Sequence, residues 1–161
     1  MKPALNRIIV VMLILLCFPL LMGADFMYWR DNFSPITLQN IGSRGQVCEG
    51  SSQVTLFTNG DAEISADNST AAQLSFAGDT LVTEYKLTFD GNGSDATGGT
   101  GTNYETYDRF LLTTPAHVTH RPGDDEVEVI LHVKASNYAN GLANAGTYKA
   151  KQTLTVHWVG P

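Results

Sequence analysis

Four histidines, His117, His120, His132 and His157, are the side chains of this sequence best suited to bind a metal or move a proton. Residues three apart on a strand point to opposite faces, which separates His117 from His120. His132 and His157 fall on the polar faces of two expected strands, and they could share a metal only if those strands pair. We therefore expect no metal, no cofactor and no catalytic set, and we predict that the chain is not an enzyme.

The range 90–103 (DGNGSDATGGTGTN) offers a second arrangement of ligand atoms. Its first six residues place oxygen-bearing side chains at alternate positions, as calcium loops do. A helical calcium loop has glycine at its sixth position and glutamate at its twelfth, whereas this sequence has Asp95 and Gly101 there. A mobile surface loop is the interpretation that we favour, because the range contains no apolar side chain larger than alanine.

Residues 1–24 have the three parts of a secretory signal. The basic residues Lys2 and Arg7 precede an apolar run at 8–22, and small residues follow it up to Ala24. The run is shorter than the roughly 20 residues of a membrane span, so we predict a signal peptide, with an uncleaved anchor helix as the alternative. The rest of the chain is then exported to the periplasm, the cell surface or the extracellular space.

The net charge of the chain limits the classes of partner that it is expected to bind. The formal net charge is −6, and the chain becomes more acidic once the two basic residues of the signal are removed. An acidic surface repels phosphate backbones and anionic lipids, so we expect no nucleic acid and no membrane contact except through the signal. Only Cys48 would remain after cleavage, which leaves a small buried hydrophobe or a link between molecules as its two roles.

Alternating apolar and polar residues dominate the sequence after the signal. Three ranges alternate strongly, at 81–89 (LVTEYKLTF), 126–134 (EVEVILHVK) and 147–158 (TYKAKQTLTVHW). A strand that buries one face and wets the other produces this pattern. One-sided strands suit two packed layers, so we predict an all-β, antiparallel β-sandwich forming one domain over 25–161.

Weaker strands are expected between the strong ones. The ranges 54–57 and 62–66 flank Asn59-Gly60, a dipeptide that favours a two-residue hairpin. The ranges 104–112 and 116–120 are further candidates. The expected core consists of Leu56, Ile64, Tyr85, Leu87, Val129, Leu131, Val133, Leu154, Val156 and Trp158.

The range 25–45 is dense in apolar and aromatic residues. It forms either the first strands of the domain's own sheet or an N-terminal arm that adds as a strand to a neighbouring subunit. The side chains of such a donor arm would be Phe26, Tyr28, Phe33, Ile36 and Leu38. Both uses require the same alternation.

The residues near the C-terminus resemble a known family. Gly146-Thr147-Tyr148, followed by the strand at 154–158 (LTVHW), resembles the last strand of spore coat protein U-like proteins and other bacterial fimbrial subunits. The resemblance implies an exported immunoglobulin-like sandwich that receives a missing strand from the arm of the next subunit, here residues 25–41. Such subunits usually carry a disulfide, which this chain with one cysteine after the signal does not have.

Two functions follow as expectations. The first is an exported structural or cell-surface subunit, fimbrial or coat-like, that pairs strands with copies of itself or with another cell-surface protein. The alternative is a monomeric module that binds a glycan or a protein through the loops 90–103 and 137–146. The exposed aromatic contacts of that module would be Tyr104, Tyr107 and Tyr138.

Overall fold

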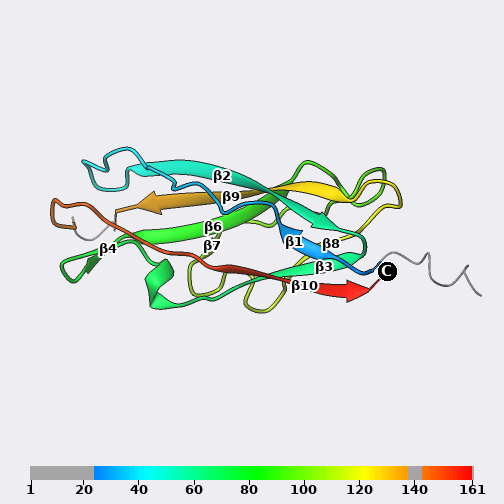
Figure 1. Ribbon diagram of the computed structural model, residues 1–161. Coiled ribbons are helices and arrows are strands. Elements are labelled where there is room, and N and C mark those ends of the chain that lie inside the picture. The colour runs from blue at the N-terminus through cyan, green and yellow to red at the C-terminus, as the bar shows by residue number, and fades with distance from the viewer. Residues whose placement is uncertain (1–23, 138–142, 161) are drawn as a thin grey trace, which may run out of the picture.

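The computed structural model of the chain describes residues 24–137 and 143–160 (Figure 1). The predicted signal, apart from Ala24, and Tyr138 lie outside the described residues. Within these ranges the secondary structure consists of strands and one 3₁₀ turn, η2 (Thr70–Ala72). None of the described residues forms a helix with the length and apolar character needed to cross a membrane. The all-β prediction is confirmed for this part of the chain.

The strands form antiparallel sheets. The larger sheet has the order β1-β2-β9-β6-β7. Its strands are β1 (Met27–Trp29), β2 (Val47–Thr58), β9 (Glu126–Ser136), β6 (Val82–Phe89) and β7 (Glu105–Thr106). The smaller sheet has the order β10-β3-β8, from β10 (Leu154–Gly160), β3 (Asp61–Ala66) and β8 (Ala116–Val118). A short ribbon joins β4 (Ser75–Phe76) to β5 (Asp79–Thr80).

The two larger sheets face each other across one core, with β2, β9 and β6 in one layer and β3 and β10 in the other (Figure 1). Alternate residues of β9 are buried, as the period-2 pattern predicts. Most of the expected core is confirmed as buried: Leu56, Ile64, Tyr85, Leu87, Val129, Leu131 and Val133. Leu154, Val156 and Trp158 are only partly buried, because β10 lies at the edge of the smaller sheet.

The hairpin expected at Asn59-Gly60 is wrong. β2 and β3 follow each other directly but lie in different sheets, so the turn is a corner between layers. Neither residue has a positive φ. Gly60 is buried, and a Cβ there would lie 2.8 Å from Cε2 of Trp158. Glycine is required at this position for close packing against the indole and not for a left-handed turn.

Two expected strands are shorter than the sequence pattern suggests. Within 104–112 only β7 is a strand, and the chain then turns inward to bury Phe110 completely. The Asn68 side chain holds this turn through hydrogen bonds to the carbonyls of Tyr107 and Phe110, at 3.1 and 2.8 Å. Within 147–158 the strand begins at Leu154, and Lys149 forms only an isolated bridge to Ser75.

Burial of Tyr85 raises the pKa of its hydroxyl from 10.0 to about 12, with a further contribution from the charge of Asp67. The hydroxyl donates a 2.7 Å hydrogen bond to the carbonyl of Ala72. The folded state therefore holds this proton more tightly than the unfolded chain does. Stability from this group is complete below pH 10 and is lost as the pH rises toward 12.

We expect Gly60→Ala to lower the free energy of unfolding by about 1–3 kcal/mol, because the added methyl group must displace the Trp158 ring. Urea unfolding followed by tryptophan fluorescence measures the change. Gly42→Ala is the matched control, because its Cβ would meet only Gln46 Oε1 at 3.9 Å. Equal stability of the two variants would contradict the packing role of Gly60.

We also expect Tyr85→Phe to flatten the loss of stability between about pH 10 and 12, while lowering stability at pH 7 through the lost hydrogen bond. Urea unfolding at a series of alkaline pH values tests this. The unsubstituted protein, measured in parallel, gives the reference slope. An unchanged slope in Tyr85→Phe would show that other groups cause the alkaline loss.

Candidate interaction surface

The N-terminal arm, defined here as residues 25–41, lies on the chain's own domain. Its strand β1 pairs with the end of β2 in the register Met27↔Thr58, Tyr28↔Phe57 and Trp29↔Leu56. β1 also contacts β10, the edge strand of the smaller sheet. The arm therefore crosses the side of the domain that lies between the edges of the two sheets (Figure 1). After β1 the amide of Arg30 donates to the carbonyl of Thr55 at 2.9 Å. The arm beyond this point forms no strand.

Apolar side chains on the inner face of the arm hold it against the core of the domain. Those that pack against the core are Met27, Trp29, Phe33, Ile36 and Leu38. The rings of Trp29 and Phe33 lie 5.9 Å apart, centroid to centroid. Ile36 and Leu38 lie over Gly50 of β2, where a Cβ would come within 2.6 and 2.9 Å of their methyl groups. The bare backbone of β2 at Gly50 therefore makes room for the arm.

The expected donor side chains do not share one face. Phe33, Ile36 and Leu38 face the core, whereas Phe26 and Tyr28 are 36% and 53% exposed. Met27 and Trp29, which are not among the expected donor side chains, point inward and pack against the core. The range is apolar on both faces near residues 26–29, so alternation alone could not show which pair points inward.

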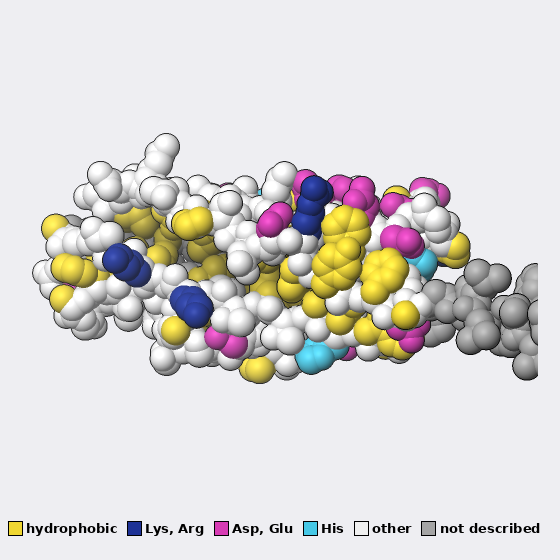
Figure 2. All heavy atoms as spheres, viewed as in Figure 1, with side chains coloured by type: hydrophobic (Ala, Val, Ile, Leu, Met, Phe, Trp, Pro, Cys, Tyr) yellow, Lys and Arg dark blue, Asp and Glu magenta, His cyan; other side chains and the backbone are white. Residues whose placement is uncertain are grey.

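Three outward rings form the aromatic patch (Phe26, Tyr28 and Phe57), in which Phe26 and Tyr28 are exposed and Phe57 is half-buried. Tyr28 stacks on Phe57, with centroids 5.3 Å apart and planes 15° apart, and Phe26 lies 6.2 Å from Tyr28. Figure 2 shows apolar side chains gathered over this region of the surface. The patch adds a second set of contacts that holds β1 to β2.

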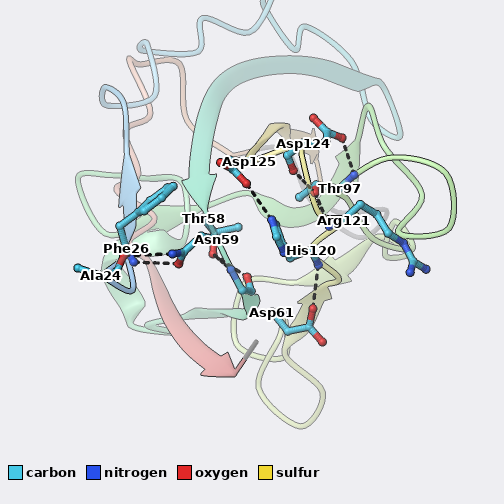
Figure 3. Close-up of polar contacts among 11 residues, drawn as sticks. Ala24, Phe26, Thr58, Asn59, Asp61, Thr97, His120, Arg121, Asp124 and Asp125 are labelled. Atoms are coloured by element: carbon cyan, nitrogen blue, oxygen red, sulfur yellow. Dashed lines mark hydrogen bonds and ion pairs between the residues drawn. The ribbon is translucent and has the colours of Figure 1, made fainter. Parts of the chain in front are cut away.

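Asn59 clamps the start of the arm by hydrogen bonds, drawn in Figure 3. Its Oδ1 accepts from the amide of Phe26 at 2.9 Å, and its Nδ2 donates to the carbonyl of Ala24 at 3.1 Å. The amide of Asn59 donates to the carbonyl of Phe26 at 3.2 Å. Asn59 therefore joins the arm to the corner between the two sheets.

A short turn, the hinge (residues 42–46), connects the arm to β2. Oε1 of Gln46 accepts hydrogen bonds from the amides of Gly42 and Ser43, at 2.8 and 3.2 Å. Its Nε2 donates to the carbonyl of Asn40 at 3.0 Å. Gly45 has a φ of +74°, a left-handed conformation that glycine adopts without steric cost. One glutamine side chain and one glycine thus set the direction of the arm.

The aromatic contacts expected for a binding module are placed differently. Tyr107 packs against the core, so its ring is not an open contact. Tyr104 lies on the outer face of the larger sheet, with Lys86 and Lys134 4.7 and 4.4 Å from its ring centroid. Tyr138 lies outside the described residues.

Charged neighbours surround Tyr104. Nζ of Lys134 lies 2.7 Å from Oε2 of Glu84. Desolvation raises the pKa of the Tyr104 hydroxyl, and the charge and hydrogen bond of Glu49 raise it further. Desolvation also lowers the pKa of His132, as does the charge of Lys86. The charged groups around Tyr104 interact with one another and with its ring across the outer face of the sheet. They form a polar surface cluster.

The two loops expected to bind together lie at opposite ends of the domain (Figure 1). Loop 90–103 is fixed next to the turn before β9, where the amide of Thr97 donates to Oδ2 of Asp124 at 2.7 Å. Asn144 of the other loop instead donates its amide to Oδ2 of Asp79 at 2.9 Å. The described parts of the two loops therefore do not line one common site.

Loop 90–103 is not the mobile loop that its composition suggests. Thr97 is buried, and its hydroxyl donates to the carbonyl of Asp124 and accepts from the amide of Arg121 (Figure 3). Asn92 Oδ1 accepts from the amides of Ser94 and Asp95, which closes a local turn. The weak calcium pattern at 90–95 is thus used for hydrogen bonds inside the loop.

The histidines do not converge. His132 lies in β9 and His157 in β10, which belong to different sheets, so the pairing that a shared metal would need does not occur. His120 Nε2 lies 2.9 Å from Oδ1 of Asp125, and the His120 amide donates to Oδ1 of Asp61 (Figure 3). In the described ranges no three or more His, Cys, Asp or Glu residues are grouped as a metal site. Cys48 is buried in β2.

Comparison of the chain with protein-family models, with curated proteins and with solved structures finds no match.

We expect Asn59→Ala to loosen the arm. The side chain provides two of the hydrogen bonds at residues 24–26, and each typically contributes about 0.5–1.5 kcal/mol. Amide hydrogen exchange at Phe26 and Arg30 should become about 5–150-fold faster, with little change in β9. Asn144→Ala is the control, because there only the backbone forms described hydrogen bonds. Equal exchange rates in both variants would rule out the clamp.

Proposed function

We propose that this protein is an exported structural or cell-surface subunit, fimbrial or coat-like, that self-associates by exchanging its N-terminal arm between copies. The proposal includes an immunoglobulin-like β-sandwich as the fold and no enzymatic activity. Support for the sandwich comes from two antiparallel sheets that contribute to one core. Support for export comes from the signal-like segment at 1–24.

The manner in which the arm is held carries the proposal. The arm fills an apolar seat beside β2, yet its paired register spans only the three residues of β1. The start of the arm is also held by the hydrogen bonds of Asn59, and beyond Arg30 the arm is held mainly by side-chain packing at Phe33, Ile36 and Leu38. An arm from a second copy would find the same seat and make the same contacts. Exchange therefore changes the connection between arm and domain but not the interactions in the seat.

The hinge determines which connection forms. In the single chain the arm folds back beside β2, the arrangement that a monomeric module also requires. The turn is maintained by the hydrogen bonds of Gln46 and the left-handed Gly45. Extending residues 42–46 would release the arm from its own domain and present it to a neighbour. A high concentration at a cell surface favours the exchanged form, because exchange joins two or more copies and is therefore driven by mass action.

Cysteine pairs across the β1–β2 register test this directly. Tyr28 and Phe57 lie directly opposite each other and outside the core, so Tyr28→Cys and Phe57→Cys can form a cross-strand disulfide with little disturbance. All variants carry Cys48→Ala to remove the native thiol. One copy carries only Tyr28→Cys, the other carries only Phe57→Cys, and the two exported proteins are mixed and oxidised.

Exchange predicts disulfide-linked dimers in the mixture, seen on non-reducing denaturing gels, and a ladder when one chain carries both cysteines. Val159→Cys replaces Phe57→Cys in the control mixture, because Val159 is exposed but is not the register partner of Tyr28. If the double variant forms only an internal disulfide at every concentration, and the mixed single variants never cross-link, the subunit proposal fails.

A further inference from the structure

A cavity of about 410 Å³ lies where loop 90–103 meets the segment that leads into β8. Its lining comes mainly from residues 99–103 on one side and from residues 113–117 on the other. Residues 99–103 precede β7, an edge strand of the larger sheet, and residues 113–115 precede β8, an edge strand of the smaller sheet. The volume falls within the roughly 300–1,000 Å³ of small-molecule sites.

The lining is about equally polar and apolar and carries little charge. Leu111, Pro115 and Ala116 provide its apolar side chains. Threonine hydroxyls and asparagine amides provide most of the rest, from Asn92, Thr100, Thr102, Asn103, Thr113, Thr114 and Thr119. Among the described residues that line the cavity, Glu105 and His117 are the ionisable ones, and none is a lysine or arginine. An anionic ligand would find no lysine or arginine partner here.

The wall formed by loop 90–103 is rigid because its backbone crosses itself closely. Gly91 and Gly98 are in contact. A Cβ on Gly91 would collide with the backbone of Thr97, and a Cβ on Gly98 would collide with the backbone of Gly91. Gly98 and Thr119 exchange backbone hydrogen bonds of 3.1 and 2.8 Å. With Thr97 fixed to Asp124, the cavity is formed before any ligand arrives, which lowers the entropic cost of binding.

Several polar groups on the lining remain available. Thr102 Oγ1 accepts from the amide of Leu87 at 2.9 Å, and Thr119 Oγ1 lies 3.4 Å from Nδ1 of His117. The side chains of Thr100, Thr113 and Thr114, in contrast, are exposed and form none of the described hydrogen bonds. These hydroxyl groups can both donate to and accept from a ligand.

A strained residue lies in the apolar part of the lining. Leu111 is 4% exposed and has a φ of +55°, a conformation that costs a branched side chain free energy. The fully buried Phe110 beside it, with its carbonyl held by Asn68, keeps the chain in this turn. The turn directs residues 113–115 to the lining, so packing elsewhere maintains the shape of the cavity.

We propose that this cavity binds a neutral saccharide. A sugar ring offers many hydroxyl groups that donate and accept, which matches threonine hydroxyls and asparagine amides. Its weakly polar C–H face suits the apolar half of the lining, which includes Leu111, Pro115 and Ala116. The proposal is independent of arm exchange, because the arm and β2 contribute no residue to the lining.

Titration of the isotopically labelled exported protein, followed by amide chemical shifts, tests the proposal. The probes are maltose, cellobiose, lactose and diacetylchitobiose, with sialyllactose as the charged comparison. We expect saturable shifts at residues 99–103 and 113–119 with a neutral sugar at up to ~20 mM, a concentration suited to weak millimolar binding. Sialyllactose should bind more weakly than lactose because the lining lacks a cation.

The combined variant Thr113→Val with Thr114→Val should weaken binding about 3–30-fold, because it removes two hydroxyl groups at nearly constant volume. Thr70→Val is the control at an exposed threonine of η2, outside the lining. The proposal is overturned if no neutral sugar shifts these amides, if shifts occur only at the aromatic patch, or if the combined variant binds as tightly as the control.

Discussion

The pairing of β9 with strands on both sides is the interaction on which the rest of the structure depends. β9 pairs with β2 from Val47↔Ser136 to Phe57↔Glu126, and with β6 from Val82↔Ser136 to Phe89↔Val129. This register places the buried side chains of three strands in one row facing the smaller sheet. The free edge of β2 then receives the arm, and the free edge of β6 receives β7 and the segment before it. A slip by one residue would turn the apolar row outward.

The second constraint is the close approach of other groups to the backbone, which glycine permits in both candidate sites. Gly50 leaves room for the arm, Gly60 for the indole of Trp158, and Gly98 for the crossing that builds the cavity wall. The composition of the glycine-rich range 90–103 predicts a mobile surface loop. The same glycines instead permit contacts that any side chain would block, so the range is among the more constrained parts of the described chain.

Strand positions and most of the core could be predicted from the sequence, because alternation is a local signal that β6 and β9 display without interruption. Sheet membership could not be predicted, since it depends on partners distant in sequence, and Asn59-Gly60 therefore suggested a hairpin where the chain changes layers. Phe110 was missed because it is buried in a turn without periodicity. The arm was recognised by composition, whereas the cavity arises from two segments that no sequence pattern connects.

Strands from the two ends of the chain contact each other, and this determines when the domain can fold. β10 pairs with β3 from Leu154↔Ala66 onward, and β1, at Met27–Trp29, contacts β10. The smaller sheet and the closed side of the domain must therefore wait until residues near 160 are free to pair. Non-local pairing of this kind makes folding slow, in the range of about milliseconds to seconds. Under the export proposed above, the chain would complete its core only after the residues of β10 have crossed the membrane.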